Sequence, residues 1–228
     1  MARHYIVSHE HKFVYLIVPK VACSSIKTAL LPLFDQDVSG EEELMREDGI
    51  PEVHWLFKAS SHPINKKQFL RGIQKGHFEG YFKFAFVRNP WDRLLSCYLQ
   101  KIAPGGQGLN RYDYGVVQLR YGMPFAEFVE AVHQIPDEEA NPHFRSQHVA
   151  VCGPDDVVMA DFVGRFERLE EDFIHVARII GAPHLKLPHL LPSPSRGARP
   201  YRDFYDDETA ERVGERFRKD AEIFEYSF

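Results

Sequence analysis

The feature of this sequence that most constrains its fold is a continuous apolar run followed by a short turn and a helical pattern, and it occurs three times. The apolar runs are residues 13–18, 81–87 and 161–166. Unbroken rather than alternating hydrophobicity is typical of strands buried on both faces, as in a parallel sheet covered by helices. The sequence therefore predicts an α/β fold of three layers, with a mainly parallel central sheet flanked by helices.

A helical pattern follows each run. After the first, Ser24 or Ser25 is expected to cap a helix with apolar side chains at helical spacing. After the second, Pro90 suits a first helical turn, and after the third, residues 169–180 are amphipathic. The glycine-rich residues 103–115 are either a lid over an acceptor or a plain flexible connection. Further patterns predict a short strand at 53–57 and helices at 66–74, 125–132 and 206–217.

Length and charge narrow the possible classes of protein. A chain of 228 residues that is 44% hydrophobic can bury one sizeable core, so we expect a single domain over residues 1–228. Its 28 Lys and Arg against 33 Asp and Glu give a formal net charge of −5. The chain as a whole therefore has no excess of positive charge to attract nucleic acid or an anionic membrane. A polyanion would have to bind at a local cluster of basic side chains.

The cysteines and the N-terminal segment bear on the compartment. Cys23, Cys97 and Cys152 are odd in number and include no Cys-x-x-Cys pair, so the sequence indicates neither a disulfide framework nor a zinc site. The apolar run at 13–18 is too short for a signal-peptide core or a transmembrane segment. These observations predict a soluble protein of a reducing compartment, the cytoplasm.

The first turn between a strand and a helix, residues 19–27, has the composition of an anion-binding site. It combines small residues with one lysine, Lys20, and two hydroxyls, Ser24 and Ser25. Backbone N–H groups at a helix start and the helix dipole favour a phosphate there. The G-x-x-x-x-G-K-[ST] loop of kinases is absent, which argues against ordinary nucleoside triphosphate binding. In the alternative interpretation the serines only cap the helix and Lys20 is solvated.

The second turn, residues 86–96, places Arg88 at a strand end and Ser96 two turns along the next helix. A guanidinium offers a planar fork of donors suited to phosphate oxygens, and a hydroxyl adds one more. The alternative is that Arg88 forms a structural ion pair with Asp92 or another carboxylate.

Together, residues 19–25 and 86–96 resemble the two nucleotide-binding signatures of the sulfotransferases, and the carbohydrate branch most closely. Residues 161–167, 201–205 and 219–228 also resemble that branch, in the same order. The resemblance implies a P-loop-like sulfotransferase fold and a soluble member of bacterial type. It also implies that a sulfuryl group passes from 3′-phosphoadenosine 5′-phosphosulfate to an acceptor hydroxyl, that of a carbohydrate, without a metal.

The resemblance also assigns roles to single residues. Lys20 would neutralise charge on the leaving phosphate, while Arg88 and Ser96 would bind the 3′-phosphate. Ala22 stands where these enzymes often have Gly, and Cys23 where many have Ser or Thr. The residues expected to donate backbone and hydroxyl hydrogen bonds to the 5′-phosphosulfate are Val21, Ala22, Cys23, Ser24 and Ser25. The late basic residues Arg196 and Arg199 either close over the 3′-phosphate or form a solvated loop.

Transfer to a hydroxyl needs a base for the departing proton, and histidine is the natural base near neutral pH. Some family members have a histidine about two dozen residues before the second signature, and His62 fits that place best. His54, His77 or a carboxylate are the alternatives. Arg145 or Gln147 is expected on the acceptor side.

Two other functions stay open: a small-molecule kinase with a divergent phosphate loop, and a donor-binding protein without turnover. The sequence leaves the identity of the acceptor and the oligomeric state undetermined.

Overall fold

The computed structural model describes residues 5–34, 53, 63–106, 119–188 and 199–228. The chain divides into two compact units, which we call the sheet unit and the helical unit. The sheet unit comprises Met1–Val18, Ala22–Val87 and Ala150–Leu190. The helical unit comprises Pro19–Val21, Arg88–Val149 and Leu191–Phe228.

Within the described residues, the sheet unit holds a five-stranded sheet of order β3-β1-β2-β4-β5. The strands are β1 (Tyr5–Ser8), β2 (Phe13–Leu16), β3 (Pro63–Ile64), β4 (Phe82–Val87) and β5 (Phe162–Arg165). β4 pairs in parallel with both β2 and β5, whereas β1 pairs antiparallel with β2 and β3. The three strands predicted from the apolar runs are therefore present and mutually parallel, and β1 and β3, which were not predicted, make the other half of the sheet antiparallel.

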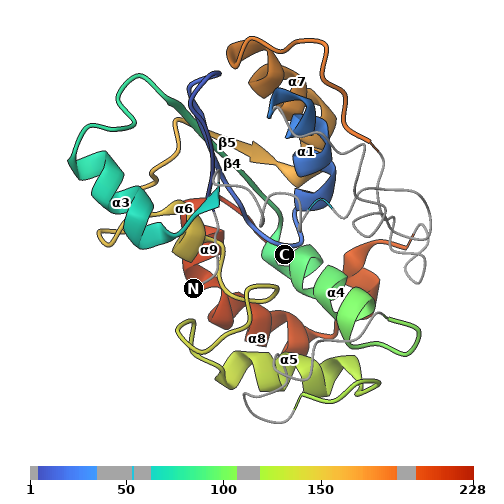
Figure 1. The fold of residues 1–228 in the computed structure, drawn as a ribbon. Coiled ribbons are helices and arrows are strands. Elements are labelled where there is room, and N and C mark those ends of the chain that lie inside the picture. The colour runs from blue at the N-terminus through green and yellow to red at the C-terminus, as the bar shows by residue number, and fades with distance from the viewer. Residues whose placement is uncertain (1–4, 35–52, 54–62, 107–118, 189–198) are drawn as a thin grey trace. The chain divides into compact units, whose positions relative to one another are not determined.

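Helices cover this sheet on both sides, which confirms the α/β class. The helices of the sheet unit are α1 (Cys23–Leu30), which the 3-10 turn η1 (Leu31–Leu33) extends, α3 (Lys66–Gln74) and α7 (Leu169–Ile179), the last preceded by the 3-10 turn η3 (Phe166–Arg168). Figure 1 shows α3 on one side of the sheet and α1 and α7 on the other. Each had been predicted from its apolar spacing to within a few residues.

Aromatic side chains fill the core of the sheet unit. Tyr15 of β2 stacks on Phe84 of β4 with ring centroids 5.1 Å apart, and both rings are fully buried. Tyr5 of β1 stacks on Phe69 of α3 at 4.6 Å, which fastens that helix to the sheet. Aromatic pairs add to the free energy gained by burial alone.

The main helices of the helical unit are α4 (Pro90–Lys101), α5 (Phe125–Gln134), α8 (Asp207–Arg216) and α9 (Arg218–Ile223). The 3-10 turn η4 (Tyr201–Phe204) precedes α8, and the chain passes from the helical unit back to the sheet unit within the short helix α6 (His148–Val151). The core of the helical unit includes Trp91, Phe128 and Phe217. Asn89 caps α4 by accepting hydrogen bonds from the backbone N–H groups of Trp91 and Asp92.

Some predicted segments lie outside the described residues. Of the strand predicted at 53–57, only Val53 is described, and it is helical rather than extended. Of the loop predicted at 103–115, only residues 103–106 are described, and they form a turn. No helix in the described parts of the chain is long and apolar enough to cross a membrane. The expectation of one domain stays a prediction.

Candidate active site

The turn after β2 carries two residues with left-handed backbone conformation. Lys20 has a φ of 69° and Ala22 a φ of 49°. A residue with a side chain is strained in this region by about 1–3 kcal/mol, and such strain is concentrated at functional sites. The left-handed φ of Ala22 also gives a physical reason why glycine suits this position.

The helix after this turn begins two or three residues earlier than predicted. α1 starts at Cys23, its N-cap is Ala22, and no side chain caps it. The expectation that Ser24 or Ser25 is the cap is therefore wrong, because both serines lie within the first turn. Backbone N–H groups of a first turn have no partner within the helix, and together with the helix dipole they favour an anion. Ser25 is buried and Cys23 is partly exposed.

Lys27, one turn further along α1, was not among the predicted site residues. Its side chain is buried, and this burial lowers the pKa of the Lys27 ammonium against a smaller opposing effect of Cys23. A lysine inside an apolar helical pattern was the only signal in the sequence. When protonated, it adds a positive charge behind the first turn of α1.

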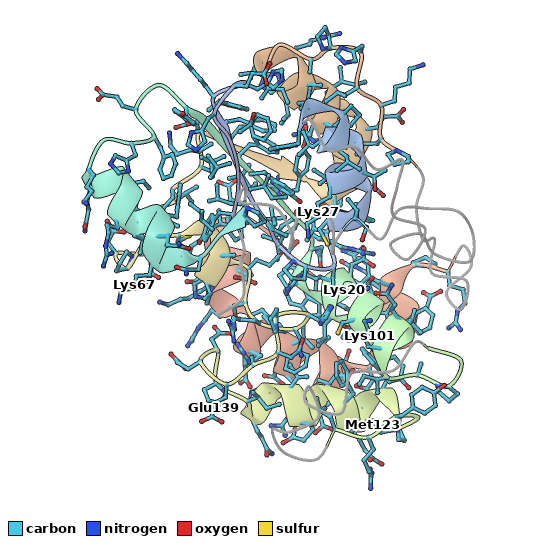
Figure 2. The ribbon with its side chains drawn as sticks, viewed as in Figure 1. Lys20, Lys27, Lys67, Lys101, Met123 and Glu139 are labelled. Atoms are coloured by element: carbon cyan, nitrogen blue, oxygen red, sulfur yellow. The ribbon has the colours of Figure 1, made fainter. Side chains whose placement is uncertain are left out.

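Lys20 and Arg88 come together in the helical unit. The Arg88 guanidinium donates from Nη1 to the carbonyl oxygen of Lys20 at 3.2 Å, although the two residues are 68 positions apart. The Lys20 ammonium donates to the side-chain oxygen of Gln100 on α4. Figure 2 shows Lys20 close to α4, with Lys101 at the end of that helix. The structure thus places the backbone of the first signature in contact with the guanidinium of the second.

Arg88 also forms the ion pair that the alternative interpretation required. Its Nε lies 2.7 Å from Asp92 Oδ2, and both side chains are less than a tenth exposed. Gln147 holds the Arg88 backbone from the other side, since its amide accepts from Arg88 N at 3.0 Å and donates to Arg88 O at 2.8 Å. These contacts fix the direction of the guanidinium.

Arg93 of α4 is a further arginine that sequence reasoning missed. It is buried, and that burial lowers the pKa of its guanidinium against the opposing effect of Asp220 and other acidic groups. It donates to three backbone carbonyls, those of Pro19 at 2.9 Å, Arg145 at 2.9 Å and Pro142 at 3.4 Å. Arg93 therefore anchors the residue just before Lys20. Ser96 lies one turn further along the same helix and is also buried.

Of the remaining predicted residues, Gln147 contacts this cluster through the Arg88 backbone. His62, His54 and Arg196 lie outside the described residues. Arg199 is described, and its guanidinium lies 4.4 Å from the centre of the Phe204 ring. Arg145 donates from Nη2 to the Ala140 carbonyl oxygen at 2.6 Å, and a role of Arg145 or Gln147 on the acceptor side stays a prediction. The described residues contain no group of His, Cys, Asp or Glu side chains suited to a metal ion.

His77 is separated from the first turn of α1 by the topology of the sheet. It belongs to the connection that enters β4 at Phe82, which pairs with Phe13 at the start of β2. The turn that leads to α1 follows the opposite end of β2. The arrangement of the sheet unit therefore argues against His77 as a base acting at that turn.

Comparison with known proteins identifies relatives over nearly the whole chain. The sequence pattern of the sulfotransferase family matches residues 3–227. Carbohydrate sulfotransferase 14 of Danio rerio is 29% identical over 201 residues, covering 82% of this chain and 51% of the relative. Carbohydrate sulfotransferase 11 of Rattus norvegicus is 28% identical over 246 residues, covering 99% and 67%. Carbohydrate sulfotransferase 14 of Homo sapiens is 32% identical over 199 residues, covering 82% and 50%. The chain thus spans half to two thirds of the length of these relatives, and no solved structure matches it significantly.

Proposed function

This chain belongs to the sulfotransferase family, and from that premise we propose that it transfers a sulfuryl group from 3′-phosphoadenosine 5′-phosphosulfate to a hydroxyl group of a carbohydrate. The names of its relatives support a carbohydrate acceptor. The observation that carries the proposal is the hydrogen bond between Arg88 and the Lys20 carbonyl, because it joins the two signatures that the family uses for one donor. The cytoplasmic compartment stays a prediction from the cysteine pattern.

The described residues fit a doubly phosphorylated donor. Lys20 and Arg88 supply two cationic side chains whose residues are in contact through the Lys20 backbone, and a donor with a 5′-phosphosulfate and a 3′-phosphate needs positive charge at two places. Val21, Ala22, Cys23, Ser24 and Ser25 are proposed to donate to the 5′-phosphosulfate, and Ser96, with Arg196, to bind the 3′-phosphate together with Arg88. No metal is needed for this scheme.

The donor supplies an activated sulfur atom with a phosphate leaving group. In an in-line transfer the acceptor oxygen forms a bond to sulfur while the bond from sulfur to the phosphate oxygen breaks. The proton of the acceptor hydroxyl passes to a base, for which we keep His62, with His54 or a carboxylate as alternatives. Lys20 stabilises the negative charge that develops on the leaving phosphate oxygen, which is where electrostatic stabilisation lowers the barrier most.

The proposal is tested by thermal unfolding in the presence of adenosine 3′,5′-bisphosphate, with ATP and magnesium as the comparison. Ligand at about 100 times its dissociation constant stabilises by about 2.7 kcal/mol, which raises the Tm of a chain of this size by about 5–10 °C. We expect this shift with the bisphosphate, and we expect its loss in Arg88→Ala. The matched control is Arg120→Ala, which breaks an exposed ion pair with Glu127 and should keep the shift.

Turnover is measured on the same samples with the sulfate donor and carbohydrate acceptors. His62→Ala is expected to keep the bisphosphate shift and to lose sulfate transfer, because the base does not hold the donor. A larger shift with ATP and magnesium would favour the kinase instead. A parent protein that binds the bisphosphate without transfer to any acceptor would favour the binding protein.

A further inference from the structure

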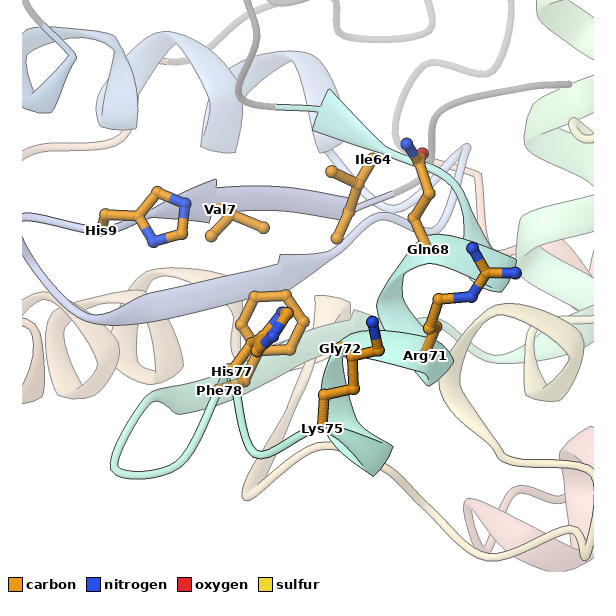
Figure 3. A pocket seen from close by; sticks show the side chains of 9 residues that line it. All are labelled: Val7, His9, Ile64, Gln68, Arg71, Gly72, Lys75, His77 and Phe78. Atoms are coloured by element: carbon orange, nitrogen blue, oxygen red, sulfur yellow. The ribbon is translucent and has the colours of Figure 1, made fainter.

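The sheet unit contains a cavity of about 680 Å³ away from the proposed donor residues. Figure 3 shows it between the edge of the sheet, α3 and the turn that follows α3. Val7, Ile64 and Phe78 form an apolar floor, and Val7 and Phe78 are buried. The other lining residues are His9, Gln68, Arg71, Gly72, Lys75 and His77. A cavity of this size suits a small organic group rather than a single ion.

The cavity lies on the α3 side of the sheet, whereas α1 covers the other side (Figure 1), and part of the cavity lining lies toward the start of β2 rather than the turn before α1. Val7 of β1 pairs with Val14, near the start of β2, and Ser8 pairs with Phe13. His77 and Phe78 lie in the connection that enters β4 at its first residue, Phe82. The turn proposed for the donor follows the last residues of β2. The cavity is therefore a separate place on the sheet unit.

The rim of the cavity is basic. Gln68, Arg71 and Lys75 are spaced three and four residues apart and so share one face of α3. His9 and His77 complete the rim, and no carboxylate is among the nine lining residues. In the part of the chain that the structure describes, the exposed Arg71 and Lys75 side chains make no ion pair. In a chain with a net charge of −5, this is a local cluster of positive charge.

The floor of the cavity is fixed by close packing. A Cβ atom on Gly72 would lie 2.4 Å from the Phe78 ring, so the absence of a side chain there allows the ring to rest against α3. The Phe78 ring also packs against the rings of Phe69 and Tyr81, with centroid distances of 5.4 Å and 5.7 Å. The Tyr81 hydroxyl in turn lies 2.9 Å from His9 Nδ1. An ordered aromatic and aliphatic floor beneath polar donors can pack against a sugar ring while the rim binds its charged groups.

We propose that this cavity binds an acidic carbohydrate chain through its sulfate or carboxylate groups. Arg71 and Lys75 donate to the oxyanions, and Val7, Ile64 and Phe78 contact the apolar face of a sugar ring. The choice of a carbohydrate rests on the proposed function, whereas the preference for an anion rests on the charges of the rim alone. The site would hold a long acceptor chain at a distance from the place where it is modified.

The test is calorimetric titration with three hexasaccharides in the presence of saturating adenosine 3′,5′-bisphosphate, which keeps the donor site occupied. The probes are heparin hexasaccharide with sulfates and carboxylates, hyaluronan hexasaccharide with carboxylates only, and neutral maltohexaose. The pocket variant is Arg71→Gln with Lys75→Gln. The matched control, Arg178→Gln with Lys186→Gln, removes the same charge from an exposed arginine and an exposed lysine of the sheet unit that do not line the cavity.

We expect the parent to bind heparin hexasaccharide and not maltohexaose. The pocket variant should bind at least about tenfold more weakly, because two charge-assisted hydrogen bonds are lost. The control should stay within about twofold of the parent. Circular dichroism and the bisphosphate shift verify that each variant is folded. If the parent shows no Tm shift with the bisphosphate, the proposed function is overturned. The proposal for the cavity is not, because the comparison of the two variants tests it independently.

Equal affinity of the pocket variant and the control would overturn the proposal. A duplex DNA of similar charge serves as a further probe. If it binds the parent as tightly as heparin hexasaccharide and is weakened equally by the pocket variant, the surface recognises polyanions in general, and the assignment to carbohydrate is wrong.

Discussion

The contacts of Arg88 make the two roles that the sequence presented as alternatives compatible with each other. Its Nε is paired with Asp92, and its Nη1 donates to the Lys20 carbonyl. A guanidinium carries five N–H donors in one plane, so an ion pair along one edge orients the group without preventing contact with a phosphate. The ion pair is then part of the proposed site, because it fixes the guanidinium before the donor binds.

Asp137 is a residue whose charge should contribute to stability in the helical unit. Burial would raise its pKa, but hydrogen bonds from the Arg216 side chain at 2.8 Å and the Ser146 backbone at 2.9 Å outweigh that effect and lower it. A carboxylate with a lowered pKa in the folded state stabilises the fold above its usual pKa of about 3.9. That contribution is lost as the pH falls through the lowered value.

We therefore predict that Asp137→Asn lowers the free energy of unfolding by about 1.5–3 kcal/mol at pH 7. The loss should shrink as the pH is lowered below about 4. Urea unfolding of parent and variant between pH 7 and pH 3 measures both effects. Asp203→Asn, at an exposed aspartate, is the control and should change stability little. A loss at pH 7 that stays constant down to pH 3 would contradict a role for the charge.

At the scale of elements, the buried runs were predictable because their hydrophobicity is continuous. β2, β4 and β5 begin within a residue of the predicted runs. β1 was missed because its four residues lie in an N-terminal segment rich in polar side chains, and its pairing with β2 and β3 decides its conformation. The start of α1 was misjudged because the left-handed conformation of Ala22 leaves no pattern in the sequence.

The candidate site was predictable where it follows a motif, and not where it depends on tertiary contact. Lys20 and Arg88 stand in recognisable signatures. Gln100, Gln147 and Arg93 hold those two residues or their neighbours, and they do so through contacts 59 to 80 positions apart. Spacing along one helix or strand carries no information about such partners.

The contact between β4 and β5 provides a prediction at this scale. A Cβ atom on Gly164 of β5 would lie 2.4 Å from the ring of Phe86 on β4, and that ring is fully buried. We predict that Gly164→Ala destabilises the protein by about 1–3 kcal/mol, because the ring must leave its place in a packed core. For a chain of this size the Tm should fall by about 2–12 °C in a thermal unfolding experiment.

A double-mutant cycle with Phe86→Leu tests the stated cause. The smaller side chain leaves room for the methyl group that Gly164→Ala adds, and this matters only if the clash with the ring is what destabilises the single variant. The double variant should therefore lose less stability than the two single variants added together. Additive losses would show that the glycine is needed for another reason.

At the scale of the whole molecule, neither unit is a continuous stretch of chain. Pro19–Val21 belongs to the helical unit although the chain before and after it belongs to the sheet unit. Arg93 holds Pro19 within the helical unit. Unfolding of the helical unit would release these three residues, and with them the connection between β2 and α1. This connectivity favours a single cooperative transition, as expected for one domain.

Two buried thiols report on the units separately. Cys97 belongs to the helical unit and Cys152 to the sheet unit, and both are at most 1% exposed. Burial raises the pKa of the Cys97 thiol, although Lys20, Arg93 and Lys101 oppose this effect. A raised pKa leaves less of the reactive thiolate, so Cys97 is further protected from reagents in the folded protein. Cys23 is partly exposed, and its labelled peptide is followed separately from those of the two buried thiols. We predict that Cys97 and Cys152 become reactive at the same urea concentration, measured by pulses of a thiol reagent and mass spectrometry of the labelled peptides.

The bisphosphate strengthens this experiment, because a ligand that binds only the folded protein raises the midpoint of every transition to which its binding is coupled. If the chain unfolds as one domain, saturating bisphosphate should move the labelling midpoints of both thiols by the same amount. Separate midpoints without ligand, or a shift of one thiol alone, would mean that the two units are independent domains. In that case the Tm used to test donor binding would describe one unit only, and each unit would have to be followed through its own cysteine.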